Sequence, residues 1–231
     1  MPAQIEDLIE KTDTAELVRD QIAAILKIES ENQVRLARAA GPPRDPEDWA
    51  LRIFIERAHP WELFRDTPEE DSGCCREAPI VNVWWDRSTF DGQRGDAVER
   101  QTASGYFNVD IYARGIAQGR SDDGHDSGDE LASRDAQRAV RLVRNILMSG
   151  HYAYLGMRGV VGKRWPESIE LHPADGERSA QQVASARVRM AVDFNEFSPQ
   201  VKGQPLERIT TEVRRDSVTG ELLLTATTSF V

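Results

Sequence analysis

The amino-acid sequence predicts an α+β fold: a mainly antiparallel sheet with helices packed on one face, an N-terminal helix and a C-terminal β-hairpin. In two long segments, apolar residues recur every three or four positions, which is the spacing of one helical face. In four other segments, apolar and polar residues alternate, which is typical of strands with one buried face. A chain of 231 residues with 39% hydrophobic residues is long enough to bury a core between these elements.

The first helix is expected over residues 14–40. Asp13, followed three residues later by Glu16, has the form of a helix N-cap, and Gly41-Pro42-Pro43 is a strong stop. The preceding stretch, MPAQIEDLIEK, is acidic and amphipathic. Because the second half of the helix carries few large apolar residues, we expect the first half to pack while the second half projects or lies against a partner.

Four segments are expected to form strands of an antiparallel sheet with one polar face: 51–58, 80–85, 104–115 and 183–194. In the third segment, alternate residues such as Phe107 and Val109 point toward the core. The opposite face of this strand carries Tyr106, Asn108, Asp110 and Tyr112. In the fourth segment, the polar face carries Ser185, Arg187, Arg189 and Asp193.

The second helix is expected in SRDAQRAVRLVRNILMSG, residues 133–150. Asp129 and Glu130 precede it, where the helix dipole favours negative charge, and Gly150 suits its end. Its apolar stripe faces the core and consists of Ala132, Ala136, Ala139, Val140, Val143 and Leu147. The opposite face carries a basic ridge of Arg134, Arg138 and Arg141, which either meets an acidic neighbour or is solvated.

These elements predict three parts of the chain. Residues 1–43 form a helical arm, residues 44–213 form the α+β core, and residues 214–231 form a hairpin that turns at Thr219-Gly220. Within the core, the polar and acidic stretch 118–130 is expected to be a mobile loop. The last strand, from Leu222 onward, carries no charge and would expose an adhesive edge unless something covers it, which suggests assembly.

Composition and charge exclude several classes of protein. A formal charge of −10 argues against a dedicated nucleic-acid-binding module, whose affinity comes largely from Lys and Arg. No apolar run approaches the roughly 20 residues of a membrane span, and the acidic N-terminus is unlike a signal peptide, so we expect a cytoplasmic protein. The adjacent Cys74 and Cys75 lack a second cluster for zinc, because the histidines are isolated: His59, His125, His151 and His172.

The sequence contains none of the common catalytic motifs, and we expect neither an enzyme nor a cofactor or metal site. The weak alternatives are acid pairs, Asp86 with Asp91 or Asp96 with Glu99, that would serve a metal-dependent hydrolase or nuclease. Two further candidates are an anion cradle at Gly156, Gly159 and Gly162 and a calcium loop around His125 with Asp122, Asp123, Asp126 and Asp129. The last set lacks the EF-hand spacing.

The order of the segments resembles the tail terminator, or tail completion, proteins of long-tailed bacteriophages. The resemblance runs from about residue 50 to about residue 200. It rests on five segments: RAHPWELF, PIVNVWWDRSTFD, ASGYFNVDIYARG, SRDAQRAVRLVRNIL and ASARVRMAVDFNE. The long first helix, the stretch 118–130 and the terminal hairpin look like additions to this common core.

The resemblance implies a structural virion protein that forms a hexameric ring at the head-proximal end of the tail tube. Such a ring ends tube polymerisation and joins the tail to the head-tail connector, so the expected partners are other copies, the tail tube protein and the connector. DNA would only pass through the lumen, where negative charge would keep it from sticking. Another neck or minor tail ring component is an alternative, as is a regulatory module that binds its partner through the N-terminal helix.

The predicted subunit-interface residues are arginines and tyrosines on exposed faces, because these types are enriched at protein contacts. They lie on the central strand, the second helix and the late strand: Tyr106, Tyr112, Arg138, Arg141, Arg187 and Arg189. We expect a chain with glutamate at both 187 and 189 to fold but not to form rings.

Overall fold

The computed structural model describes residues 11–64, 77–90, 100–119, 125–172, 181–197, 208–214 and 222–229. Residues Ile9–Ser198 cluster as one compact unit, and the C-terminal strands belong to a second. The predicted α+β class is confirmed, because the described part of the chain contains two long helices and a five-stranded, mostly antiparallel sheet. The first helix belongs to the same unit as the sheet.

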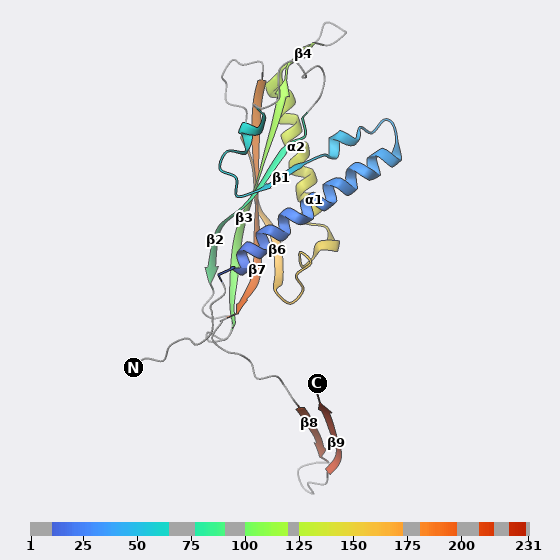
Figure 1. Cartoon of the computed structure of the whole chain (residues 1–231), viewed down its shortest axis with the longest axis vertical. Coiled ribbons are helices and arrows are strands. Elements are labelled where there is room, and N and C mark those ends of the chain that lie inside the picture. Colours follow the sequence, from blue (N-terminus) through green and yellow to red (C-terminus); the bar gives the residue numbers. More distant parts are fainter. Residues whose placement is uncertain are drawn as a thin grey trace, which may run out of the picture. The chain divides into compact units, whose positions relative to one another are not determined.

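Figure 1 shows the elements along the chain. The first unit begins with α1 (Thr14–Ala40), η1 (Pro46–Trp49), β1 (Arg52–Ile55), η2 (Pro60–Phe64), β2 (Ile80–Phe90) and β3 (Arg100–Ile116). It continues with β4 (Gln118–Gly119), β5 (His125–Asp126), α2 (Gly128–Leu147), η4 (Gly150–Tyr152), β6 (Val161–His172) and β7 (Gln181–Phe197). The second unit contains β8 (Arg208–Arg214) and β9 (Leu222–Ser229), which pair as an antiparallel hairpin, while its predicted turn at residues 219–220 lies outside the described residues.

The sheet has the strand order β1-β2-β3-β7-β6. Its centre is the pair β3 and β7, which are antiparallel from Arg100 opposite Phe197 to Ile116 opposite Gln181. The predicted strand 51–58 is shorter than expected and runs parallel to β2, so the sheet is antiparallel at every other pairing. The strand predicted over 80–85 continues to Phe90.

The edge strand β6 was not expected from the sequence, which suggested a glycine-bearing loop there. Gly156 and Gly159 do lie in the preceding turn, with positive φ angles of 73° and 92°, but Gly162 is already in the strand. Pro166 made a strand unexpected here, because a proline in a sequence argues against a central strand. It is tolerated in β6 because β6 is an edge strand with a register shift at this residue. The register of β6 on β7 shifts at Val161/Lys163 and again at Pro166/Ser168.

Helix α1 begins where the sequence places it, since the Asp13 side chain accepts a hydrogen bond of 2.8 Å from the Ala15 amide. The first half packs into the core, as predicted, and contributes the buried residues Ala15, Val18, Ile22, Ala23, Ile25 and Leu26. The second half extends away from the sheet before the chain returns through η1 to β1 (Figure 1). In the described residues, no helix has the length and hydrophobicity of a membrane span.

The stretch 118–130 is not a loop throughout, which corrects the sequence-based expectation. In its described part, β4 pairs with β5, and α2 starts at Gly128 rather than at 133. Asp129 and Glu130 occupy the first turn of the helix, where the partial positive charge of the helix N-terminus favours them. Acidic residues that looked like a solvated loop therefore belong to the start of α2, which ends at Leu147, before Gly150.

Both helices pack on the same face of the sheet. The main core joins the buried faces of α1 and α2 to Val83 of β2, Phe107 of β3 and Val188 of β7. The predicted apolar stripe of α2 is confirmed as buried, and a smaller cluster continues the core through Ala113, Ala132, Ala136 and Ala184. The other face of the sheet carries neither α1 nor α2.

Gly115 on β3 marks the closest approach of α2 to the sheet. A Cβ atom at this position would lie 1.9 Å from the carbonyl oxygen of Gly128 and 2.6 Å from the Ala132 amide nitrogen. Both neighbours are backbone atoms of the first turns of α2, so they can give way only if the whole helix moves. The absence of a side chain at residue 115 therefore sets the distance between α2 and the sheet.

We expect Gly115→Ala to lower the free energy of unfolding by about 3 kcal/mol, the upper range for overpacking a core. Urea unfolding followed by circular dichroism measures this change. The matched control is Gly150→Ala, because a Cβ atom there meets nothing within 4 Å. Equal stability of the two variants would contradict the close packing of α2 on β3.

Glu196 of β7 lies at the start of α1, where its carboxylate accepts a hydrogen bond of 3.0 Å from the Thr14 hydroxyl. Burial, with a further contribution from the neighbouring Asp13, raises the pKa of Glu196 above its ordinary value. The folded state therefore disfavours the ionised form of this side chain. The resulting destabilisation is present above the raised pKa and disappears once the pH falls below the ordinary glutamate pKa.

We expect Glu196→Gln to raise the melting temperature at pH 7, because the amide removes a partly buried charge beside Asp13 and still accepts the Thr14 hydrogen bond. The gain should shrink as the pH is lowered and vanish near pH 4. Calorimetry across this range tests the prediction. Glu31→Gln, at an exposed position of α1, serves as the control and should show no such pH dependence.

Candidate functional site: two interaction surfaces

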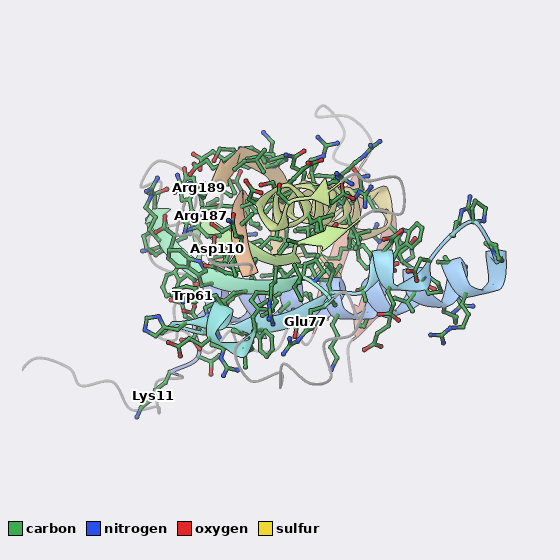
Figure 2. All side chains as sticks on the ribbon, turned by 90° about the horizontal axis from the view of Figure 1, so that it is seen from above. Lys11, Trp61, Glu77, Asp110, Arg187 and Arg189 are labelled. Atoms are coloured by element: carbon green, nitrogen blue, oxygen red, sulfur yellow. The ribbon has the colours of Figure 1, made fainter. Side chains whose placement is uncertain are left out.

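The first candidate surface is the side of the sheet that carries neither α1 nor α2, here named the helix-free face. Figure 2 shows Arg187, Arg189 and Asp110 grouped on this side. The strand register places on it one outward row from each of four strands. The rows include Asn82, Trp84 and Arg87 from β2, Tyr106, Asn108, Asp110 and Tyr112 from β3, Ser185, Arg187, Arg189 and Asp193 from β7, and Lys163, Trp165, Ser168, Glu170 and His172 from β6.

Asp110 is the centre of the helix-free face and is only 6% exposed. Its carboxylate accepts hydrogen bonds from Arg187 Nε at 2.7 Å and Nη2 at 3.0 Å, and from the Trp84 indole at 2.8 Å. The hydrogen bond to Asp110 raises the pKa of Arg187, whose guanidinium also lies over the Trp84 ring at 5.1 Å. One buried carboxylate thus joins the three strands β2, β3 and β7.

Arg189 makes a second cross-strand contact beside this centre. Its Nε donates to the Asn108 amide oxygen at 3.1 Å and lies 3.8 Å from a carboxylate oxygen of Glu167. Asn108 is fully buried, and its Nδ2 finds no acceptor among the described residues. Arg189 is therefore held over the sheet by partners on both β3 and β6.

The 3-10 helix η2 covers one end of the helix-free face. The Trp61 ring contacts the Tyr112 ring at 5.4 Å, and Arg114 donates to the Phe64 carbonyl at 2.6 Å. Burial raises the pKa of Tyr112 to about 12. An open hollow beside η2 is lined by Glu56, Arg57, Ala58, Asn82, Trp84, Asp110, Tyr112 and Arg187.

Several cationic side chains of the helix-free face lie over aromatic rings. Arg87 lies 4.6 Å from the Tyr106 ring centroid, and Lys163 lies 4.8 Å from that of Trp165. Such pairs combine large contact area with directed polar groups, and Trp, Tyr and Arg are the residues most enriched where proteins bind one another. The helix-free face therefore has the composition of a protein-binding surface.

The second candidate surface is a groove between the projecting half of α1 with η1 and the C-terminal half of α2, here named the arm groove. Trp49 and Leu142 lie in its middle, and Arg138 and Arg141 line one end. At the other end, the Tyr152 hydroxyl donates to Glu29 at 2.5 Å, a contact that raises the pKa of Tyr152 to about 12. The remaining lining residues are Asn32, Gln33, Asp48, Asn145, Ile146, Ser149 and His151.

The six residues predicted for the subunit interface separate into two groups. Tyr106, Tyr112, Arg187 and Arg189 lie on the helix-free face, whereas Arg138 and Arg141 lie at the arm groove. Since α2 packs on the opposite face of the sheet, the structure does not bring these two groups together. The prediction therefore becomes one of two distinct surfaces.

The candidate chemical sites do not assemble in the described residues. Asp86 is exposed beside Arg87, while Asp91, Asp96, Glu99, Asp122, Asp123 and the cysteine pair lie outside the described residues. Within the described ranges, no group of three or more His, Cys, Asp or Glu residues is arranged to hold a metal ion. His59 and His151 contact neighbouring aromatic rings, those of Trp61 and Tyr152.

Sequence reasoning missed the tryptophans that shape both surfaces. Trp84 occupies the outward position of the run 80–85, so the alternation that placed Val83 in the core could have placed Trp84 on the opposite face. Trp61 and Trp49 lie in short 3-10 helices, where no periodicity reveals which side faces solvent. Trp61 remains 37% exposed.

No protein-family model matches the chain, and its sequence has no significant match among curated proteins.

We expect Arg187→Met to lower the free energy of unfolding by about 2 kcal/mol, because it removes two charge-assisted hydrogen bonds from buried Asp110. Combining it with Asp110→Asn should restore part of that loss, since the uncompensated charge is then gone. Urea unfolding of both single variants and the double variant measures the coupling. Arg87→Met is the control, and its loss should stay below about 1 kcal/mol.

The same contact changes what a glutamate substitution at residue 187 would do. A carboxylate there would face buried Asp110, so we expect misfolding rather than a folded chain that fails to assemble. A chain with glutamate at both 187 and 189 is therefore expected to misfold. Substitutions at exposed positions of the helix-free face are the better test of assembly.

Proposed function

We propose that the protein is a structural virion protein that forms a ring at the head-proximal end of a phage tail tube, ends tube polymerisation and joins the tail to the head-tail connector. The observation that carries the proposal is the helix-free face, a sheet surface rich in tryptophan, tyrosine and arginine that neither α1 nor α2 covers. A monomeric protein rarely leaves such a surface unused.

The resemblance to tail terminators supports the proposal because its segments adjoin in the fold. RAHPWELF ends in η2, PIVNVWWDRSTFD forms β2, and the next three segments lie in β3, α2 and β7. Together they make the centre of the sheet, the covering helix and the edge of the helix-free face. The resemblance thus extends over one contiguous body rather than over scattered pieces.

A ring requires each copy to offer two different surfaces, because a heterologous contact repeated by rotation closes on itself. The helix-free face and the arm groove are different in composition and lie on opposite sides of the sheet. Such an arrangement suits repeated head-to-tail contact between copies. The ends of the ring would then face the tail tube protein and the connector, and the charge of −10 would keep passing DNA from sticking to the lumen.

We expect the purified chain to form a closed ring at high protein concentration, or when mixed with tail tubes, and to cap the tube end. Native mass spectrometry gives the number of copies, and electron microscopy shows the ring and its place on the tube. Capping at one tube end separates a terminator from other neck components. A chain that stays monomeric with and without tubes would contradict the proposal.

The residues of the helix-free face supply a sharper version of this test. Arg87→Glu with Lys163→Glu reverses two exposed charges on the helix-free face. The variant should stay folded but need a roughly tenfold higher protein concentration to form rings. Lys27→Glu with Arg38→Glu makes the same change in charge at exposed positions of α1 and is the matched control. Equal assembly by both variants would exclude the helix-free face from the contact.

A further inference from the structure

We propose that the arm groove of one copy binds the acidic, amphipathic segment 5–10 of a second copy. The inference rests on the proposed function, because it names one contact between neighbouring copies in addition to the contact made by the helix-free face. The groove involves α1 and η1, which lie outside the segments that resemble tail terminators.

The groove offers an apolar floor and two walls of opposite charge. Trp49 and Leu142 provide the floor, and both side chains are only partly buried. The wall formed by α2 carries Arg138 and Arg141, both exposed, although Arg138 also lies 3.7 Å from Asp135. A partner must therefore present apolar side chains to the floor and negative charge to the α2 wall.

The acids on the opposite wall orient the partner. Glu29 accepts hydrogen bonds from Tyr152 at 2.5 Å and from Asn32 at 3.1 Å, and Asp48 lies on η1. These carboxylates repel a second row of negative charge. An acidic segment consequently fits in one orientation only, with its carboxylates toward α2.

Residues 5–10, with the sequence IEDLIE, match these requirements. Ile5, Leu8 and Ile9 recur at the three- and four-residue spacing of one helical face. Glu6 and Glu10 are four residues apart, so in a helix both lie on one side of this apolar face. An amphipathic helix whose apolar side enters a groove is a recurrent mode of peptide recognition.

The geometry of α1 requires that the segment come from another copy. Glu29, the α1 residue nearest the start of the groove, follows Thr14 by 15 residues, which is about 22 Å along the helix axis. Ile9 precedes Thr14 by five residues and reaches about 17 Å when fully extended. With residues 5–9 docked as a helix, the reach grows by only about 6 Å. The segment then meets no more than the start of its own chain's groove, whereas a neighbouring copy has no such restriction.

A charge-reversal experiment on the full chain tests the match. Arg138→Glu with Arg141→Glu should weaken self-association by about tenfold in sedimentation equilibrium. Adding Glu6→Arg with Glu10→Arg should restore the association to within about threefold of the parent. The matched control, Arg134→Glu with Arg144→Glu, makes the same charge change on α2 outside the groove and should stay within about twofold. Circular dichroism checks that all variants fold.

A cysteine cross-link identifies the occupant directly. Two variants are made in a background without Cys74 and Cys75: Leu8→Cys, and Asn145→Cys with a longer tag so that the two chains differ in size. Oxidation of their mixture should give a disulfide-linked dimer that contains one chain of each kind. Rings without this dimer, or without an effect of groove charge reversal, would overturn the inference and leave the proposed function standing. A chain that carries both Leu8→Cys and Asn145→Cys provides a further test. If rings form but the disulfide is found only within this chain and not between chains, the inference is also overturned. A monomer under all conditions would refute both.

Discussion

The carboxylate of Asp110 is the constraint on which the helix-free face depends. A charge buried in a sheet is costly unless it is neutralised and fully hydrogen-bonded. Here the compensation comes from β7 through Arg187 and from β2 through Trp84, so the neighbours of β3 are fixed by the needs of one side chain. The outward rows of the other strands follow from that register.

This constraint also divides the face into two kinds of residue. Arg187 and Arg189 are committed to partners within the chain, so they hold the surface in shape and expose only part of their guanidinium groups. Arg87, Lys163 and Trp61 have larger exposed areas and lie nearer the margins. In a contact between copies, the first kind provides a rigid floor and the second kind provides the choice of partner.

Periodicity was enough to predict the two helices and the central strands, because each buries one face against the core. It could not reveal β6, whose proline and bulges break the alternation, nor that β1 runs parallel to β2, which depends on the chain path between them. The residues of the helix-free face could be named from alternation. The pairing of Asp110 with Arg187 could not, because the two are 77 residues apart and meet only through strand register. The arm groove was equally hidden, since it lies between separate elements.

The outer edge of β6 carries a lasting consequence for a protein that accumulates in many copies. An uninterrupted strand at a sheet margin is a template on which further chains can stack without limit. Pro166 removes one backbone donor from that margin, and the two register shifts bend it. Fibre growth is thereby discouraged at this border of the sheet, and assembly is left to contacts between side chains, which involve a fixed number of partners and can stop.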